Sequence, residues 1–443
     1  MLPEFEGPVR WRLRRLTGVA GAMPLLRLER AEFAAVLGRP IVFDDESDSD
    51  PHRRAGVWDV VVDASAPHAS LRSDAEARRL VLTIAAPTDL VDGINLLHSL
   101  AYSPDACVTD TEAPTYDAAF ERIRDEVANI YPSMALRGLD WVAITRRYDY
   151  VRELAGPEFW SHAALWIAEL GDAHTQLVGA GPRFHPPYVA AMDDDGATLL
   201  RVPVDTAAWG AGVRPGDRLA VDDPVWWLRR TGASPQHRAM VAGRRFLAMT
   251  APVRGFTAIG GDGARVEWTE ERRVQPGLCA DGNVVTLTRI DADLPRMLRR
   301  ALSRAAPASP LVLDLRGNVG GSLVAAAEAR RLLVRDSGVF GTAAFTDGRG
   351  TLVDPVTLTT APDPDAWPGD VRVLVDAMTY SAAEDLLHPL VGAPHVTIEG
   401  GPTGGGSGRP HGRLIKDGVR LLVSTAITYT RSGDPIEYVG IGR

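Results

Sequence analysis

The sequence predicts a multidomain α/β protein, and two short segments in its last third carry most of that prediction. Residues 311–321 read LVLDLRGNVGG, and residues 373–384 read VLVDAMTYSAAE. Each opens with an apolar run of the kind that a strand buried on both faces requires, and each changes to small residues just before a helical pattern. Strand and helix patterns also alternate over residues 276–443, which is typical of a sheet with right-handed crossover connections.

Length and composition bound the class of protein. A chain of 443 residues with 45% hydrophobic content is expected to form roughly three domains. The formal charge is −9 and no basic run stands out, which argues against a nucleic-acid partner. The two cysteines, Cys107 and Cys279, exclude a disulfide framework and a Cys-rich metal site, and they are compatible with a reducing compartment.

Residues 1–105 are expected to form an N-terminal α+β domain of unassigned role, with strand-like runs at 58–62 and 79–84. The acidic stretch 44–50 lacks the ligand spacing and glycine turn of a calcium loop, so we expect a solvated loop. A basic and apolar stretch at 10–26 superficially resembles a signal peptide, but its glycines and proline and the missing cleavage site favour a cytoplasmic protein. No stretch is long enough for a membrane span.

Residues 106–180 predict a helical subdomain. Apolar residues recur at spacings of three and four in two stretches: Phe120, Ile123, Val127 and Ile130, then Phe159, Ala163, Trp166 and Leu170. The second stretch ends at Gly171 and is followed by Asp172, Ala173, His174 and Thr175. A histidine on a loop supported by packed helices is well placed for catalysis.

Residues 181–275 contain a stretch, 199–219, that resembles the core of a PDZ domain: a strand, a small-residue turn, and Pro-Gly-Asp before the next strand. Such domains bind an extended peptide as an added strand. The alternative is a simple β-hairpin insertion. We therefore expect a PDZ-like, β-rich insert at this place.

Residues 276–443 are expected to form the α/β core. Strands are predicted at 284–290, 311–315 and 371–375, and helices at 322–334 and 381–391. A hairpin is predicted at 413–423, with Asp417 and Gly418 at its turn.

The two informative segments carry candidate chemistry. Ser381 begins a predicted helix, where its hydroxyl lies near the positive helix end and is a candidate nucleophile. The backbone N–H of Ala382, together with that of Gly320 or Gly321, is a candidate oxyanion hole, because glycine allows the backbone to approach a substrate oxygen. Phosphate binding is the rival interpretation of the glycine loop, but the P-loop pattern and its lysine are absent.

With these residues in view, residues 110–441 resemble the C-terminal-processing, or tail-specific, serine peptidases, and more closely their tricorn-core branch. Four matches occur in the family's order: the helical stretch 131–141 leading to 170–175, the PDZ-like insert, residues 314–321, and residues 379–384 followed by 400–404. The resemblance implies a ClpP/crotonase-like α/β catalytic core.

The family activates its serine with a lysine or with a histidine, and the resemblance places the lysine position at Gly406. The chain's one lysine, Lys416, lies in the hairpin turn, where a solvated charge is expected. His174 occupies the place of the histidine, and a neutral imidazole is a suitable base. The alternatives are a structural role for His174, or His388 and His395 as bases; His388 is expected to point away from Ser381.

By resemblance, the residue that orients the histidine is Glu437. The tricorn branch places a linking serine before the histidine, whereas this chain has Ala173. Asp172 is the local alternative, although loop acids more often bind backbone N–H groups. Glu384 is expected to be a helix-surface or structural acid, and Arg316 and Asn318 to shape the glycine loop.

The sequence therefore predicts a serine peptidase that cleaves peptides or protein C-terminal regions through an acyl-enzyme, without a metal or organic cofactor. Two alternatives stay open: a catalytically silent member that binds peptides or other ligands, and a pathway-dedicated hydrolase or acyl-transfer enzyme that acts on one peptide precursor. The expected partner is a peptide or protein substrate, and the resemblance also allows a homo-oligomer.

Overall fold

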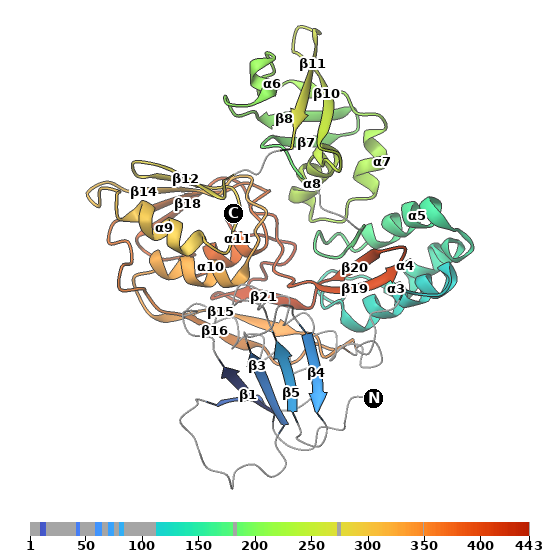
Figure 1. The fold of residues 1–443 in the computed structure, drawn as a ribbon, viewed down its shortest axis with the longest axis horizontal. Helices are drawn as coiled ribbons and strands as arrows, with labels where there is room; N and C mark the ends of the chain where they lie inside the picture. Colours follow the sequence, from blue (N-terminus) through green and yellow to red (C-terminus); the bar gives the residue numbers. More distant parts are fainter. Residues whose placement is uncertain are drawn as a thin grey trace.

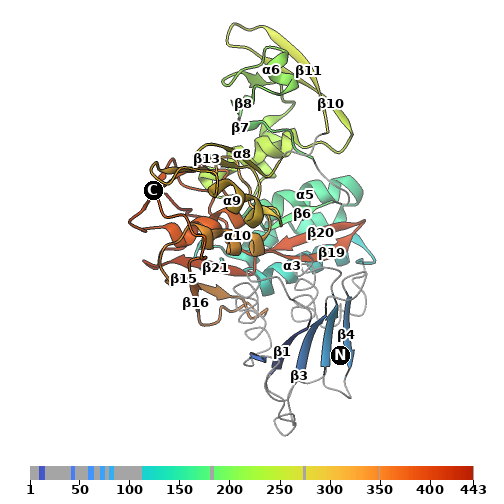
Figure 2. The same cartoon turned by 60° about the vertical axis from the view of Figure 1, so that its left-hand side comes forward.

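The computed structural model describes residues 112–442 except 180–183, 273–275 and 349, and before residue 112 the backbone of five strands. Figures 1 and 2 show these five strands at one end of the molecule, the sheet of residues 189–271 at the other end, and the remaining elements between them. The acidic stretch 45–50, the stretch 15–26 and Cys107 lie outside the described residues. Among the helices that the structure describes, none is long and apolar enough to span a bilayer.

The core of residues 276–442 is a five-stranded sheet in the order β12-β13-β14-β17-β18, in which every neighbouring pair except β12 and β13 is parallel. The strands are β12 (Leu278–Asp281), β13 (Val284–Leu287), β14 (Leu311–Asp314), β17 (Val371–Leu374) and β18 (Val396–Glu399). The helices that pack on it are α9 (Leu294–Leu302), α10 (Leu323–Ala329) and α11 (Ala382–Leu387). The three strands and two helices predicted in this region are confirmed, with shorter bounds.

The helices cover one face of this sheet. Arg372 of β17 points to the other face and is exposed, so the expectation of strands buried on both faces is wrong. Leu311, Leu313 and Val373 are fully buried, and their cluster includes residues of all three helices. Burying side chains of this size contributes about 1.5–3 kcal/mol each. The parallel order also brings the carboxyl ends of β14 and β17 together, which is where open α/β sheets place their sites.

A second, antiparallel sheet follows the order β16-β15-β21, with β15 (Gly338–Phe345), β16 (Val356–Thr360) and β21 (Ala426–Thr430). It lies between the core helices and the N-terminal strands (Figure 1).

The helical region contains α3 (Tyr116–Ile130), α4 (Trp141–Arg147), the 3₁₀ helix η4 (Asp149–Glu153) and α5 (Gly156–Ala168). It packs against a three-stranded sheet of β6 (Gln176–Val178), β19 (His411–Lys416) and β20 (Val419–Val423). The predicted hairpin is β19–β20, and its turn residues Asp417 and Gly418 both have positive φ. Because β6 pairs with β20, the loop that carries His174 is tied to the C-terminal part of the chain.

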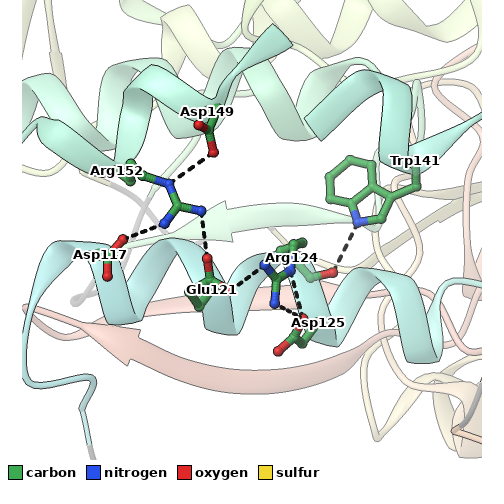
Figure 3. Close-up of polar contacts among 7 residues, drawn as sticks. All are labelled: Asp117, Glu121, Arg124, Asp125, Trp141, Asp149 and Arg152. Atoms are coloured by element: carbon green, nitrogen blue, oxygen red, sulfur yellow. Dashed lines mark hydrogen bonds and ion pairs between the residues drawn. The ribbon is translucent and has the colours of Figure 1, made fainter. Parts of the chain in front are cut away.

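Polar contacts fix the arrangement of these helices (Figure 3). The Arg152 guanidinium joins Asp149 on η4 to Asp117 and Glu121 on α3, at 2.9, 2.9 and 2.6 Å. Trp141 Nε1 donates to the carbonyl of Arg124 at 3.0 Å. Exposed ion pairs contribute little individually, so the buried side chains of α3 and α5 stabilise the unit and the ion pairs set its register.

Residues 184–272 form a five-stranded antiparallel sheet in the order β11-β10-β9-β8-β7. Its strands are β7 (Val189–Asp193), β8 (Gly196–Arg201), β9 (Arg218–Leu219), β10 (Val253–Ile259) and β11 (Arg265–Glu271). Its helices are α6 (Ala207–Gly210), α7 (Pro224–Arg229) and α8 (Pro235–Leu247). The region has its own apolar core and is more than a single hairpin.

The N-terminal strands form a sheet in the order β2-β1-β3-β5-β4. They are β1 (Val9–Arg14), β2 (Ile41–Asp44), β3 (Trp58–Asp63), β4 (Ser70–Asp74) and β5 (Arg79–Thr83). The two strands predicted here, at 58–62 and 79–84, are confirmed as β3 and β5.

Candidate active site

Ser381 occupies the turn between β17 and α11, at the carboxyl edge of the core sheet. Its φ of 58° and ψ of −128° lie in a region that non-glycine residues rarely adopt. The preceding residue is held in place, because Tyr380 N donates to the carbonyl of Asn318 at 2.9 Å. The strained turn therefore presents the Ser381 side chain at a fixed place above the sheet.

His174 reaches this serine from the helical region. Gly171, at φ 57°, ends the turn after α5, and the loop that follows places His174 Nε2 2.9 Å from Ser381 Oγ. The imidazole is buried, and burial lowers the pKa of His174 below its usual 6.5. A neutral imidazole at hydrogen-bond distance from a hydroxyl is able to accept its proton.

Asp172 organises the loop on the other side of His174. Its carboxylate is buried and accepts hydrogen bonds from His174 N at 2.8 Å, Thr175 Oγ1 at 2.7 Å and Ser424 Oγ at 2.6 Å. These three hydrogen bonds hold the carboxyl group in place. As expected for a loop acid, Asp172 binds a backbone N–H and makes no hydrogen bond to the imidazole.

The second ring nitrogen, His174 Nδ1, is buried and has no hydrogen-bond partner among the described residues. Ser424 is nearby: a Cβ on Gly408 would lie 2.1 Å from Ser424 Oγ and 3.4 Å from His174 Nδ1. A hydroxyl that donates to Asp172 still has lone pairs to accept a hydrogen bond from an imidazole N–H. Ser424 therefore donates to Asp172 and lies near the Nδ1 side of the His174 ring.

Glu437 is also buried close to this cluster, but its carboxyl is bound elsewhere. Glu437 Oε2 accepts a hydrogen bond from Ser407 N at 3.0 Å. Burial, assisted by the negative charge of Asp172, raises the pKa of Glu437 well above its usual range. The structure thus brings Ser381 and His174 together, and places Glu437 near them without a hydrogen bond to His174.

The glycine loop lies directly against Ser381. A Cβ on Gly320 would come within 2.8 Å of Ser381 Cβ and 2.7 Å of Ala382 N, so this position requires glycine. Gly320 N donates to Asn318 Oδ1 at 2.9 Å. The N–H groups of Gly321 and Ala382 have no acceptor within the described part of the chain, which leaves them available for a substrate oxygen.

Asn318 and Arg316 shape this loop. The Asn318 side chain is fully buried, and its Nδ2 donates to the carbonyl of Leu287 at 2.9 Å. The Arg316 guanidinium is held by both carboxylate oxygens of Asp314, at 2.9 and 2.8 Å.

Glu384 ties Ser381 to the loop of residues 403–406. Its carboxylate accepts four hydrogen bonds, from Ser381 N at 3.1 Å, Gly405 N at 2.9 Å, Gly406 N at 2.8 Å and Thr403 Oγ1. Burial raises the pKa of Glu384 to about 7, and the donors oppose that shift. Glu384 is thus a structural acid, and it is buried within the fold.

The Tyr380 ring occupies the space beside Gly406, the position that the resemblance gives to a lysine. A Cβ on Gly406 would lie 1.9 Å from Tyr380 Cζ, so the ring fills the space that a side chain at this position needs. The Tyr380 ring also packs between His174 and His237, with ring centroids 4.6 and 4.4 Å away. Lys416, meanwhile, lies in the β19–β20 hairpin, 5.3 Å from the centre of the Tyr116 ring.

The remaining histidine candidates are engaged elsewhere. His388 is buried and packs edge-on against Phe340, with ring centroids 4.8 Å apart. His395 Nε2 lies 3.0 Å from the carbonyl oxygen of Leu333. His174 is the ring that reaches Ser381.

Helix α8 adds contacts that the sequence did not reveal. Ser234 Oγ donates to the carbonyl of Gly404, and Gln236 Nε2 lies 3.2 Å from the carbonyl oxygens of Thr403, Tyr438 and Val439. His237 and Ser424 were equally unforeseen, because each is supplied by a segment far from Ser381 in sequence. No local pattern marks them; they are found only once the segments are packed together.

Three comparisons relate this chain to known proteins. Residues 283–442 match the model of peptidase family S41. The structure resembles the photosystem II D1 C-terminal processing protease, at 18% identity and a TM-score of 0.52, and mature CPAF, at 12% identity and a TM-score of 0.55. In both cases 74% of this chain and 92% of the other chain are covered. No curated protein sequence matches the chain.

The match over residues 283–442 supports a hydrolase of the serine peptidase class. More particularly, this part of the chain is similar to peptidase family S41, and the likeness to the two solved proteases shows a shared fold.

Proposed function

We propose that this protein cleaves peptides or protein C-terminal regions by acyl-enzyme chemistry, with Ser381 as nucleophile and His174 as general base. The observation that carries the proposal is the 2.9 Å separation of His174 Nε2 and Ser381 Oγ. The base accepts the hydroxyl proton as Oγ attacks the scissile carbonyl carbon. It then returns the proton to the leaving amine, and water releases the acyl group by the reverse steps.

The N–H groups of Gly321 and Ala382 stabilise the negative oxygen of the tetrahedral intermediate. Donors fixed in this way typically lower the barrier by about 2.7–4 kcal/mol each. Gly320 contributes by its shape, because its own N–H is bound to Asn318.

For the acid behind His174, the geometry favours Asp172, acting through Ser424, over Glu437. Asp172 accepts three hydrogen bonds, one of them from Ser424, and Ser424 lies near the Nδ1 atom of His174. Glu437 accepts its hydrogen bond from Ser407 N and has none to His174 or Ser424.

Residues 184–272 act, in this proposal, as a PDZ-like module that presents the substrate chain to a ClpP/crotonase-like core. The order β11-β10-β9-β8-β7 leaves β7 and β11 as the sheet edges, and an edge strand is where such modules add a peptide strand.

The unpartnered Nδ1 atom of His174 favours a second candidate, a silent member that binds peptides without cleaving them. Incubation of a diverse peptide mixture with the wild type and with Ser381→Ala, followed by mass spectrometry, separates the two. Products that appear only with the wild type support the peptidase. Peptide binding without products from either protein supports the silent binder, and products from one precursor alone support a dedicated enzyme.

A further inference from the structure

A cavity of about 750 Å³ lies between the helical region and helices α7 and α8. Its walls come from three parts of the chain: the helical region with the turn after α5, the segment 229–238, and Tyr438. Arg230 at the end of α7 donates to Ser161 Oγ on α5 at 2.7 Å, which holds the two walls together.

Positive charge dominates this cavity. Four arginines line it, and Glu169 is the single acidic residue of its lining. Glu169 is already bound, because it pairs with Arg147 at 2.9 Å and accepts a hydrogen bond from Tyr148 Oη at 2.8 Å. Its charge therefore does not neutralise the other three arginines.

These three, Arg137, Arg229 and Arg238, have no carboxylate partner among the described residues. Arg238 donates to the carbonyl of Leu228 at 3.0 and 2.9 Å. Arg137 donates to the carbonyl of Leu170, and its Nε atom is buried without a partner. Arg229 and Arg238 are exposed side chains. In a chain with a formal charge of −9, three guanidinium groups without a carboxylate partner around one cavity favour an anion as its ligand.

The cavity borders the candidate active site. Gly171, three residues before His174, lies in its wall, and so does Ala233, which packs with Ala173 and Tyr380. The guanidinium carbon of Arg137 lies 3.9 Å from the centre of the Tyr438 ring, and Tyr438 is the neighbour of Glu437 in the sequence. The wall residue Ala233 thus packs against Tyr380, whose ring lies against His174.

We propose that this cavity binds a carboxylate of a peptide ligand, supplied by an acidic side chain or by a free C-terminus. The guanidinium fork matches a carboxylate in a bidentate manner, and Leu165, Ala168 and Pro235 offer an apolar wall for the neighbouring peptide side chain. The ligand's role as a substrate rests on the proposed peptidase function, whereas its binding does not.

The test measures binding in the Ser381→Ala protein by calorimetry, so its outcome does not depend on serine chemistry. Three acetylated tetrapeptides of sequence Ala-Leu-Ala-X differ in the last residue. Glu amide carries a side-chain carboxylate, Gln with a free C-terminus carries a terminal carboxylate, and Gln amide carries no carboxylate. We expect at least one carboxylate peptide to bind roughly tenfold more tightly than the neutral peptide, and its affinity to fall with added salt.

Substitutions locate the site. Arg229→Gln with Arg238→Gln is expected to abolish the preference for the carboxylate peptide. The matched control, Arg296→Gln with Arg300→Gln, removes the same charge from a second cavity, of about 500 Å³, and is expected to preserve the preference. Equal affinities for all three peptides, no binding, or a preference that survives the first pair of substitutions would overturn the proposal. The comparisons of salt concentrations and of peptides use no arginine variant. They therefore test carboxylate binding even if the Arg229→Gln, Arg238→Gln protein fails to fold.

Discussion

The Nε2 atom of His174 lies 2.9 Å from the Oγ atom of Ser381, although 207 positions separate the two residues in the chain. The helical region holds the histidine and the core sheet holds the serine. Strand β6, paired with β20, joins the two units next to this contact. The site therefore depends on the packing of both units, and each prediction below tests one part of it.

The pH dependence of Ser381 reactivity should report the buried imidazole. Burial lowers the pKa of His174 below 6.5, so the ring is neutral above that pH and becomes protonated as the pH falls. A protonated Nε2 cannot accept the serine proton. We expect the rate of covalent labelling by a fluorophosphonate to fall on acidification with a midpoint below 6.5, measured between pH 5 and 8. A midpoint above 6.5, or a flat profile, would contradict this role for His174.

Exchanging the two buried acids separately should identify the one that supports His174. We expect Asp172→Asn to slow labelling on the order of 100-fold, because the carboxyl that holds the His174 loop and Ser424 is replaced by an amide. Glu437→Gln is expected to change the rate little, because Glu437 makes no hydrogen bond to His174. Asp336→Asn, at an exposed position, is the control. The reverse order of effects would assign the role to Glu437.

Glu384→Gln should destabilise the fold. Each carboxylate oxygen of Glu384 now accepts two hydrogen bonds. In glutamine one of these oxygens is replaced by an NH₂ group, which would face two donors in either orientation of the amide. A buried donor left without its acceptor costs about 1–3 kcal/mol. Urea unfolding measures this difference, with Glu271→Gln on the exposed part of β11 as the control. Equal stabilities of the two variants would show that the four hydrogen bonds contribute little.

Gly406→Ala should also lower the free energy of unfolding, because the new Cβ would meet the Tyr380 ring at 1.9 Å. Overpacking of this kind costs about 1–3 kcal/mol. Gly401→Ala is the matched control, since a Cβ there meets nothing within 4 Å. If both variants unfold at the same urea concentration, the ring does not block this position.

The sequence predicted the core elements well because their signals are local. The apolar runs at 311–315 and 371–375 became β14 and β17, and the Asp417–Gly418 turn formed the expected hairpin. Helix ends were overestimated: the stretch 381–391 forms α11 and then a short 3₁₀ helix, His388–Leu390, with Pro389 in its first turn.

Contacts between distant segments escaped the sequence for a physical reason. Ser424 and His237 carry no distinctive spacing, and they approach His174 and Tyr380 only through the pairing of β20 with β6 and the packing of α8. The sequence also did not reveal which polar side chains are buried. Glu384 has the periodicity of an exposed helix residue, yet the loop of residues 403–406 covers it completely.

The most direct test of the Ser381–His174 pair is intact-mass detection of a fluorophosphonate adduct on the wild type, Ser381→Ala and His174→Ala. We predict one adduct per chain on the wild type, none on Ser381→Ala, and a much slower reaction of His174→Ala. An adduct that persists on Ser381→Ala, or a wild type that does not react at all, would contradict an activated serine at this site.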